Sequence, residues 1–243
     1  MWTLFWREIN SFFSSITGYV VIIVYLAVTG LFLWVFPGEF NIIESGYASL
    51  DSLFIIAPWV FLFLVPAVTM RLFSDEKRTG TLELLLSRPI SDLKIILAKY
   101  LAGVALVCLA ILPTLIYYLS VSVLGDTPGN LDTGGFWGSF IGLILLAGIY
   151  VSIGLFTSSL TDNQIVSFIL GVVGCFLLFL GFDSLSKLGF SGGLENFIAS
   201  LGISFHYNSL ARGVIDTRDL IYFLTVIAVF TLFTKVVLES RKW

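Results

Sequence analysis

Residues 70–99 read MRLFSDEKRTGTLELLLSRPISDLKIILAK, a charged segment between two long apolar stretches. We call this segment the island. It holds six of the thirteen Lys and Arg residues of the chain, namely Arg71, Lys77, Arg78, Arg88, Lys94 and Lys99. Because basic residues gather in the cytoplasmic loops of membrane proteins, the island is expected to mark the cytoplasmic side of a membrane protein.

The composition of the whole chain also indicates a membrane protein. Of its 243 residues 58% are hydrophobic and only 12% are charged, and the mean hydropathy is +1.00. Soluble domains carry about 25% charged residues, whereas a helix needs about 20 apolar residues to cross the hydrocarbon. Suitable stretches lie at residues 19–36, 53–73, 95–124, 136–158, 165–182 and 220–237. We therefore predict an all-α polytopic protein, a single domain over residues 1–243 with six transmembrane helices.

The charges of the remaining loops orient this bundle. Loops 37–52 and 125–135 contain acidic residues but no Lys or Arg, so they are expected outside the cell. The island and the two ends of the chain are expected inside. Ten cations then lie inside, namely the six of the island together with Arg7, Lys235, Arg241 and Lys242. Three lie outside, namely Lys187, Arg212 and Arg218. This arrangement places both termini in the cytoplasm.

Two further segments show helical periodicity. In residues 1–17, apolar side chains recur every three or four positions: Trp2, Phe5, Trp6, Ile9, Phe12, Phe13 and Ile16. We predict an amphipathic helix in the membrane interface, the alternative being a cytoplasmic extension of the first span. In the outer loop 183–219, the spacing of Leu194, Phe197, Ile198 and Leu201 and a second semi-apolar stretch at 203–214 predict two short helices.

Several kinds of chemistry are missing. No ionisable residue lies at mid-membrane depth, which disfavours an ion-coupled carrier. The only histidine, His206, lies in the outer loop and is interpreted as a surface or packing residue, and Cys108 and Cys175 as packing residues within spans. We predict no catalytic residue and no metal site. There is no G-x-x-x-x-G-K-[ST] motif, so any ATP-driven motor must be another polypeptide.

The middle of the island predicts a short helix outside the membrane. Gly80 is expected to break the helix that leaves the second span, and Pro89 ends the new segment. Leu82, Leu85 and Leu86 share one apolar face, with Glu83 beside it. We interpret this helix as a lever between a cytoplasmic partner and two spans. The alternative is an interfacial helix that binds no partner.

The segment 76–89, EKRTGTLELLLSRP, followed by Lys99, strongly resembles the signature of type-2 ABC transporter permeases. The resemblance implies that residues 74–93 form a coupling segment whose helix docks in a cleft of a separate ABC ATPase. Leu82, Leu85 and Leu86 would pack into that cleft, and Glu83 would pair with a cation or backbone donors there. The coupling residues implied in this way are Glu76, Gly80, Thr81, Leu82, Glu83, Leu85, Leu86 and Pro89.

Within that superfamily the chain most resembles the permeases associated with gliding motility. The similar stretches are residues 61–69 (FLFLVPAVT), 160–164 (LTDNQ), His206 with 211–216 (ARGVID), and 238–243 (LESRKW). In the outer loop the resemblance singles out His206, Arg212 and Gly213.

The expected function is that of a permease subunit, not an enzyme, in an ATP-driven exporter of the bacterial inner membrane. The chain itself would hold no cofactor, because ATP and Mg²⁺ would bind two copies of the partner ATPase. A second permease, identical or different, would complete a dimer. An accessory subunit outside the membrane is left open, and no nucleic-acid partner is expected. The alternatives are an ATPase-independent channel or secondary carrier, and a membrane anchor for a soluble protein.

Overall fold

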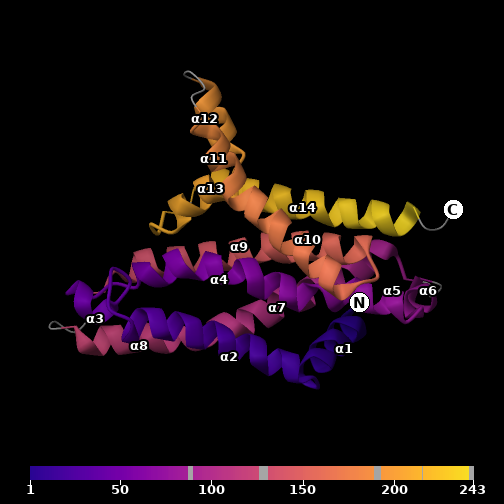
Figure 1. Ribbon diagram of the computed structural model, residues 1–243, viewed down its shortest axis with the longest axis horizontal. Coiled ribbons are helices and arrows are strands. Elements are labelled where there is room, and N and C mark those ends of the chain that lie inside the picture. The colour runs from indigo at the N-terminus through magenta and orange to yellow at the C-terminus, as the bar shows by residue number, and fades with distance from the viewer. Residues whose placement is uncertain (87–89, 126–130, 189–192, 215, 241–243) are drawn as a thin grey trace.

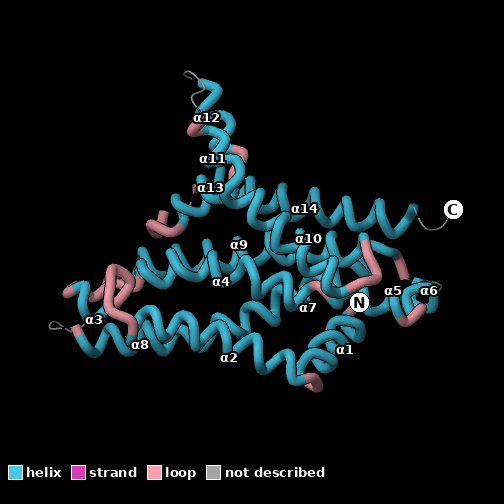
Figure 2. The backbone as a smooth tube through the Cα atoms, viewed as in Figure 1, coloured by secondary structure: helices cyan, strands magenta, loops and turns pink. Residues whose placement is uncertain are grey.

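The computed structural model describes residues 1–86, 90–125, 131–188, 193–214 and 216–240, and every regular element in these ranges is a helix (Figures 1 and 2). Helices long and apolar enough to cross a membrane span Ile16–Val35, Asp51–Arg78, Asp92–Leu124, Thr133–Leu160, Gln164–Ser186 and Thr217–Glu239. Each overlaps one of the predicted apolar stretches over nearly its whole length. The prediction of an all-helical protein with six membrane-spanning helices is confirmed.

Several spans consist of more than one helical element. The first comprises α2 (Ile16–Gly30) and the π-helical η1 (Leu31–Val35), and the second comprises α4 (Asp51–Thr69) and α5 (Arg71–Arg78). The third comprises α7 (Asp92–Ile111), the 3₁₀ turn η2 (Leu112–Thr114) and α8 (Leu115–Leu124). The fourth is α9 (Thr133–Leu160), the fifth comprises α10 (Gln164–Phe176), the π-helical η3 (Leu177–Gly181) and α11 (Phe182–Ser186), and the sixth is α14 (Thr217–Glu239).

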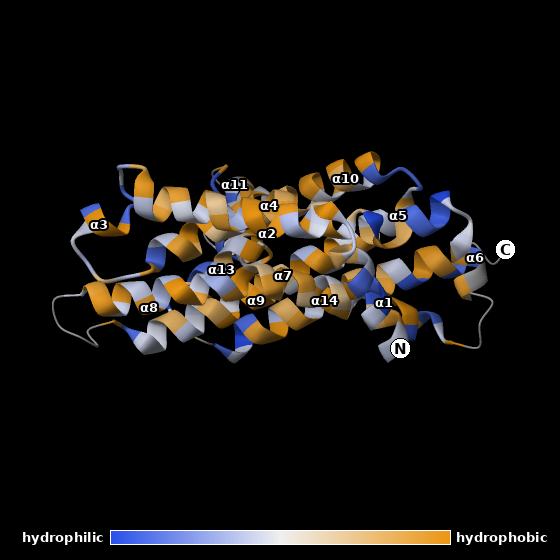
Figure 3. Ribbon diagram, turned by 90° about the horizontal axis from the view of Figure 1, so that it is seen from below, coloured by the Kyte–Doolittle hydropathy of each residue, from blue (hydrophilic) through white to orange (hydrophobic). Residues whose placement is uncertain are grey.

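Shorter helices lie at both ends of the bundle. Near the island are α1 (Trp2–Phe13) and α6 (Thr81–Leu86). At the opposite end, which we call the far end, α3 (Ile42–Ser45) precedes the second span, and α12 (Gly193–Ser200) and α13 (Ile203–Leu210) precede the sixth. The two short helices predicted in the outer loop are therefore present, and α11 and α12 project away from the long axis of the bundle (Figure 1). Hydrophilic residues gather on α5 and α3, near opposite ends of the bundle (Figure 3).

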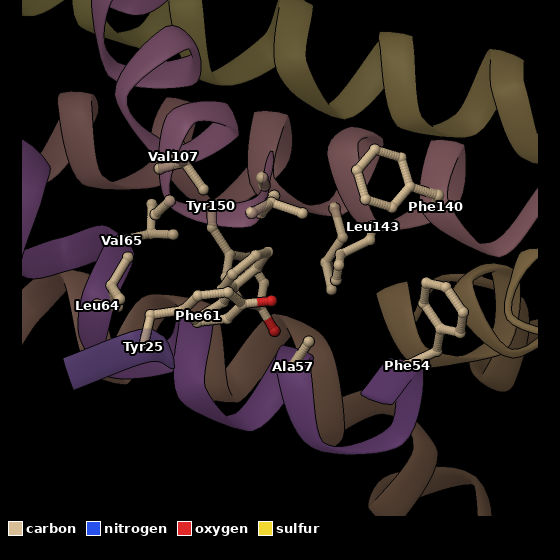
Figure 4. Close-up of a cluster of buried hydrophobic side chains, with 14 of the residues drawn as sticks. Tyr25, Phe54, Ala57, Phe61, Leu64, Val65, Val107, Phe140, Leu143 and Tyr150 are labelled. Carbon is tan, nitrogen blue, oxygen red and sulfur yellow. The ribbon is translucent and has the colours of Figure 1, made fainter. Parts of the chain in front are cut away.

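Helix α9 forms the centre of the bundle. It packs against α4, α7, α10 and α14. In its most apolar stretch 78% of the residues are buried inside the protein, compared with 22% for the first and fifth spans and 17% for the sixth. Its residues Leu143 and Tyr150 meet Tyr25 of α2 and Phe61 of α4 in the apolar core (Figure 4). The peripheral spans therefore keep most of their apolar surface for lipid or for other membrane subunits.

Glycines allow other segments to approach α9 closely. A Cβ atom on Gly138 would lie 2.5 Å from the carbonyl oxygen of Gly213, and one on Gly142 would lie 2.7 Å from Cβ of Leu210. Gly154 faces the side chain of Thr69 on α4 in the same way. Small residues commonly permit such contacts between helices in membranes. The glycine pair at 138 and 142 therefore packs against α13 and the turn that follows it.

Candidate functional site

The island forms a compact structure at one end of the bundle, built on α5. The hydroxyl oxygen of Ser158, near the end of α9, accepts hydrogen bonds from the backbone N–H groups of Phe73 and Ser74 at 2.9 and 3.1 Å and donates one to the carbonyl oxygen of Met70 at 2.9 Å. Ser158 thus satisfies backbone donors at the start of α5, where a helix has no partners of its own. Lys77 also donates to the carbonyl oxygen of Ser159. Helix α5 is therefore fixed to the central helix.

A tight corner separates α5 from α6. Gly80 has φ +70°, a left-handed conformation that glycine adopts at little cost. The hydroxyl groups of Thr79 and Thr81 are 2.9 Å apart, and Thr79 also donates to the carbonyl oxygen of Asp75 at 2.9 Å. The predicted break at Gly80 is confirmed, and Thr81 serves as part of the corner.

The orientation of α6 differs from the expectation. Leu82 and Leu85 are only 4% and 8% exposed, because they pack into a cluster with Leu72, Phe73 and Ile95 of the same chain. Leu82 and Leu85 therefore attach α6 to its own bundle. Thr81 and Glu83 are exposed on the other side, and the Glu83 carboxylate forms no ion pair within the described residues. Only the backbone of Leu86 is described, and Pro89 lies outside the described residues.

An ion network joins three helices beside α6. Lys99 of α7 is fully buried, and its Nζ lies 2.6 Å from the carbonyl oxygen of Leu72, 3.0 Å from Oε1 of Glu8 and 3.1 Å from Oε1 of Glu76. Arg7 Nη2 lies 2.6 Å from Glu8 Oε1 and 2.5 Å from Glu76 Oε1. Two cations and two carboxylates thus connect α1, α5 and α7, and the Lys99 ammonium group donates hydrogen bonds to Glu8 and to the carbonyl oxygen of Leu72.

Glu76, which the resemblance implies to be a coupling residue, is part of this network. Its side chain is 15% exposed and points toward Lys99. The physical reason is the buried ammonium group, which needs carboxylate partners in an apolar surrounding. Glu76 therefore stabilises the position of α5, and of the expected docking residues only Thr81 and Glu83 present described, exposed side chains.

The electrostatics of the network follow from its partial burial. Burial acts to raise the pKa of Glu8, but the charge of Lys99 and the hydrogen bonds from Arg7 and Lys99 outweigh it and hold that pKa below its ordinary value. Burial acts to lower the pKa of Arg7, and the bond to Glu8 and the charges of Glu8 and Glu76 raise it instead. Both groups are therefore charged at neutral pH.

Acidification is expected to loosen α1 from α7. Because the pKa of Glu8 is lower in the folded protein, its contribution to stability is complete above its ordinary pKa of 4.5 and is lost as the pH falls through the folded value. Nitroxide labels on the exposed residues Asn10 and Lys94, in a cysteine-free background, would report the separation of the two helices by electron paramagnetic resonance. The distance distribution should broaden at acid pH, and Glu8→Gln should broaden it already at neutral pH. Identical distributions for wild type and Glu8→Gln would contradict the role of this carboxylate.

The predicted outer-loop residues lie at the far end, away from the island. His206 on α13 contacts Asp219 and the carbonyl oxygen of Ser200, and its ring stacks on Tyr222 with centroids 3.9 Å apart. Gly213 has φ +77° and passes so close to the backbone of Gly135 that a Cβ atom would clash. Arg212 lines a polar cavity. His206 thus lies between Asp219, Ser200 and Tyr222, and Gly213 is required by the crossing of two backbones.

Sequence reasoning did not identify Arg7, Glu8 or Ser158 as part of the site. A signal for Glu8 was present, since it is the one acidic residue among the aromatic and aliphatic residues of 1–17. Lys99 likewise lies within an apolar stretch, seven residues after the start of α7. An ionisable residue in such a place usually has a specific partner. Ser158 gave no signal, because serine is common in membrane helices.

The chain matches a family of known proteins. A family model described as "ABC-2 family transporter protein" matches residues 40–243, which is most of the chain and includes the island, Lys99 and the far-end helices. A search of curated proteins finds no relative that matches.

Proposed function

Because the chain belongs to the ABC-2 family of transporter proteins, we propose that it is the membrane-spanning subunit of an ATP-driven exporter and that its island docks a separate ABC ATPase. The observation that carries the proposal is α6, a short helix at the charged end of the bundle. Leu82 and Leu85 attach it to the chain, while Thr81 and Glu83 face outward. A carboxylate without an ion-pair partner in the described residues suits a cationic or N–H-rich cleft.

The proposed orientation places the island, α1 and both termini in the cytoplasm, with the protein in the bacterial inner membrane. The charge distribution supports this, since ten of the thirteen Lys and Arg residues then lie on the inner side. ATP and Mg²⁺ would bind the ATPase subunits, one beside each permease of a two-fold or pseudo-two-fold dimer. The second permease is an identical copy or a related chain. The narrower similarity to gliding-motility permeases remains a hypothesis from short motifs.

The contacts of α5 provide a path for movement from the ATPase to the spans. A push on α6 is passed to α5 through their common corner at Gly80. From α5 it reaches α9 through Ser158, and it reaches α7 and α1 through Lys99. Since α9 contacts most other spans, a small displacement at the island would change the packing of the whole bundle.

The proposal is tested by purifying the tagged chain in mild detergent from its native host. A P-loop ATPase should be recovered with wild type and lost with Glu83→Lys, because the lysine would be repelled by the cationic or N–H-rich cleft that is proposed to bind the carboxylate. Glu39→Lys is the matched control, since Glu39 is also exposed but lies near α3 at the far end. It should retain the ATPase and ATP-driven turnover.

Two outcomes would contradict the docking model. If the ATPase is recovered and turnover stays coupled in Glu83→Lys, α6 is not the docking element. If intact complexes contain this chain alone and it supports flux in vesicles without ATP, the channel or carrier function is correct. Binding of a soluble protein that is independent of nucleotide, with no transport, would instead indicate a membrane anchor.

A further inference from the structure

A long groove of about 660 Å³ runs along the outside of the bundle between the first and second spans. Every described residue that lines it is hydrophobic. Its floor includes Ile56 and Leu64, which are buried, and its walls include Val24 of α2 and Trp59 and Phe63 of α4, which are exposed. The groove lies within helices that are apolar enough to cross a membrane, so its open side faces hydrocarbon.

The length of the groove is that of a lipid chain. On the first span its lining extends from Val20 to Phe32, and on the second from Ile55 to Ala67, twelve positions in each case. At 1.5 Å per residue this distance is about 18 Å. The hydrocarbon core of a bilayer is about 30 Å thick, so the chains of one leaflet extend over about 15 Å. A single acyl chain can therefore lie along the groove.

The end of the groove nearest the island is polar. Arg71 follows Ala67 by four positions and Thr17 precedes Val21 by four, so both lie one helical turn beyond the apolar lining. The guanidinium group of Arg71 connects the two spans, because Nη1 donates to Oγ of Ser15 at 3.3 Å and Nη2 donates to Oγ1 of Thr17. An arginine has five N–H donors, so these two contacts leave others for a ligand. The groove thus ends at a half-buried cation.

The charge of Arg71 is not balanced by a carboxylate in the described part of the chain. Arg71 borders the ion network on its other side, but the two carboxylates of the network already contact two other cations. Asp75, which borders the same small cavity, pairs with Arg78 at 3.3 Å. Among the described residues Arg71 itself forms no ion pair. It is therefore a surplus positive charge at the end of an apolar groove.

We propose that the groove binds one acyl chain of an anionic phospholipid from the leaflet on the island side, with the lipid phosphate at Arg71. Guanidinium groups bind phosphate through paired, charge-assisted hydrogen bonds. The apolar lining provides the complementary surface for the chain, and the unbalanced cation favours a headgroup with net negative charge over a zwitterionic one. The site does not include α6, so its test is independent of ATPase docking.

A second copy of the chain is the other candidate to cover the groove, and it fits less well. In a two-fold dimer the same surface lies on both sides of the axis, so a groove on the axis faces another groove. Two facing hollows leave a gap, whereas the cores of stable interfaces pack as densely as protein interiors. A flexible acyl chain follows the hollow instead.

The proposal is tested by photo-cross-linking on the purified protein in phosphatidylcholine bilayers. The probes are phosphatidylglycerol and phosphatidylcholine, each with a diazirine on the acyl chain, and labelled peptides are identified by mass spectrometry. In wild type the phosphatidylglycerol probe should label residues 20–32 and 55–67 about tenfold more efficiently than the phosphatidylcholine probe. Arg71→Gln should abolish this preference. Lys94→Gln is the matched control and should keep it, because Lys94 is also an exposed cation of the island but does not line the groove.

A second pair of variants tests the apolar part of the site. Val24→Phe places a ring in the groove about two turns from Thr17, so it should reduce labelling by both probes without removing the cation. Val236→Phe introduces the same ring at an exposed position of the sixth span, outside the groove, and should leave labelling unchanged.

Several results would overturn the proposal. Equal labelling of the groove by the two probes in wild type would show an apolar surface without headgroup selection. A preference that survives Arg71→Gln, or that Lys94→Gln abolishes as well, would exclude Arg71 as the phosphate ligand. A disulfide between two copies of a Val24→Cys variant, in place of lipid labelling, would show that a second copy covers the groove. If Arg71→Gln does not fold, Arg71→Lys decides, because it keeps the charge and should keep part of the preference, whereas its complete loss would contradict the proposal.

Discussion

Lys99→Met should separate α1 and α5 from α7 and should lower the thermal stability of the purified protein more than any exposed charge substitution. Its ammonium group is fully buried, and it is the cation that contacts both Glu8 and Glu76 from inside the bundle. Arg7 contacts the same carboxylates, but its side chain is half exposed and cannot replace the buried charge. Removing one partner of a buried ion pair costs about 3–5 kcal/mol. The expected result is a large fall in melting temperature and loss of coupled ATP turnover.

The control for this experiment is Lys94→Met on the same helix. Lys94 is exposed, so its loss should change the melting temperature little. A triple variant, Lys99→Met with Glu8→Gln and Glu76→Gln, tests the cause, because it removes the uncompensated carboxylates as well. It should regain much of the lost stability. A Lys99→Met protein with the same melting temperature as wild type would show that the network contributes nothing to the stability of the fold.

Gly154→Ala is expected to destabilise the centre of the bundle. The added Cβ atom would overlap the side chain of Thr69 and would come within 2.9 Å of the Thr69 Cβ atom, so α9 and α4 would have to move apart. Overpacking of this kind costs about 1–3 kcal/mol, although alanine is otherwise the better helix former. The measurement is the midpoint of thermal or denaturant unfolding in detergent.

Two variants isolate the steric cause. Gly181→Ala introduces the same methyl group within the fifth span, where the nearest atoms are 4.0 Å away, and should leave stability unchanged or raised. Thr69→Ala combined with Gly154→Ala removes the hydroxyl and methyl groups of Thr69, including the nearest overlapping atom, and should recover part of the loss. Equal effects of alanine at Gly154 and Gly181 would rule out a close contact between α4 and α9.

The six spans were predictable because hydrocarbon imposes a simple requirement on sequence. An unbroken apolar stretch of about 20 residues must close its own backbone hydrogen bonds as a helix. The ends of the spans were less certain, because a helix can continue into polar residues when another segment satisfies its backbone groups. The apolar stretch of the second span ends at residue 73, but the membrane-spanning helix continues as α5 to Arg78, where Ser158 satisfies backbone groups at the start of α5.

The site was predictable only in part, for a physical reason that α6 illustrates. Periodicity identified Leu82 and Leu85 as one apolar face, but it does not say whether such a face packs on its own chain or on a partner. The ion network was harder still. Lys99 and Glu8 are 91 positions apart in the sequence, and the residues around either one do not identify the other as its partner. Long-range pairing of this kind follows from the arrangement of helices, which the pattern of one segment does not determine.

The position of α9 has a consequence for the order in which the protein assembles during synthesis. The most buried span is the fourth to leave the ribosome, so the first three enter the bilayer before the helix that completes their packing exists. Each of these three spans must therefore be apolar enough to remain in the bilayer before α9 packs against it. Lys99 is a fully buried charge in the third span, yet its partners Glu8, Leu72 and Glu76 all precede it in the chain. Every partner of this charge is therefore already synthesised when the third span emerges, one full span ahead of α9.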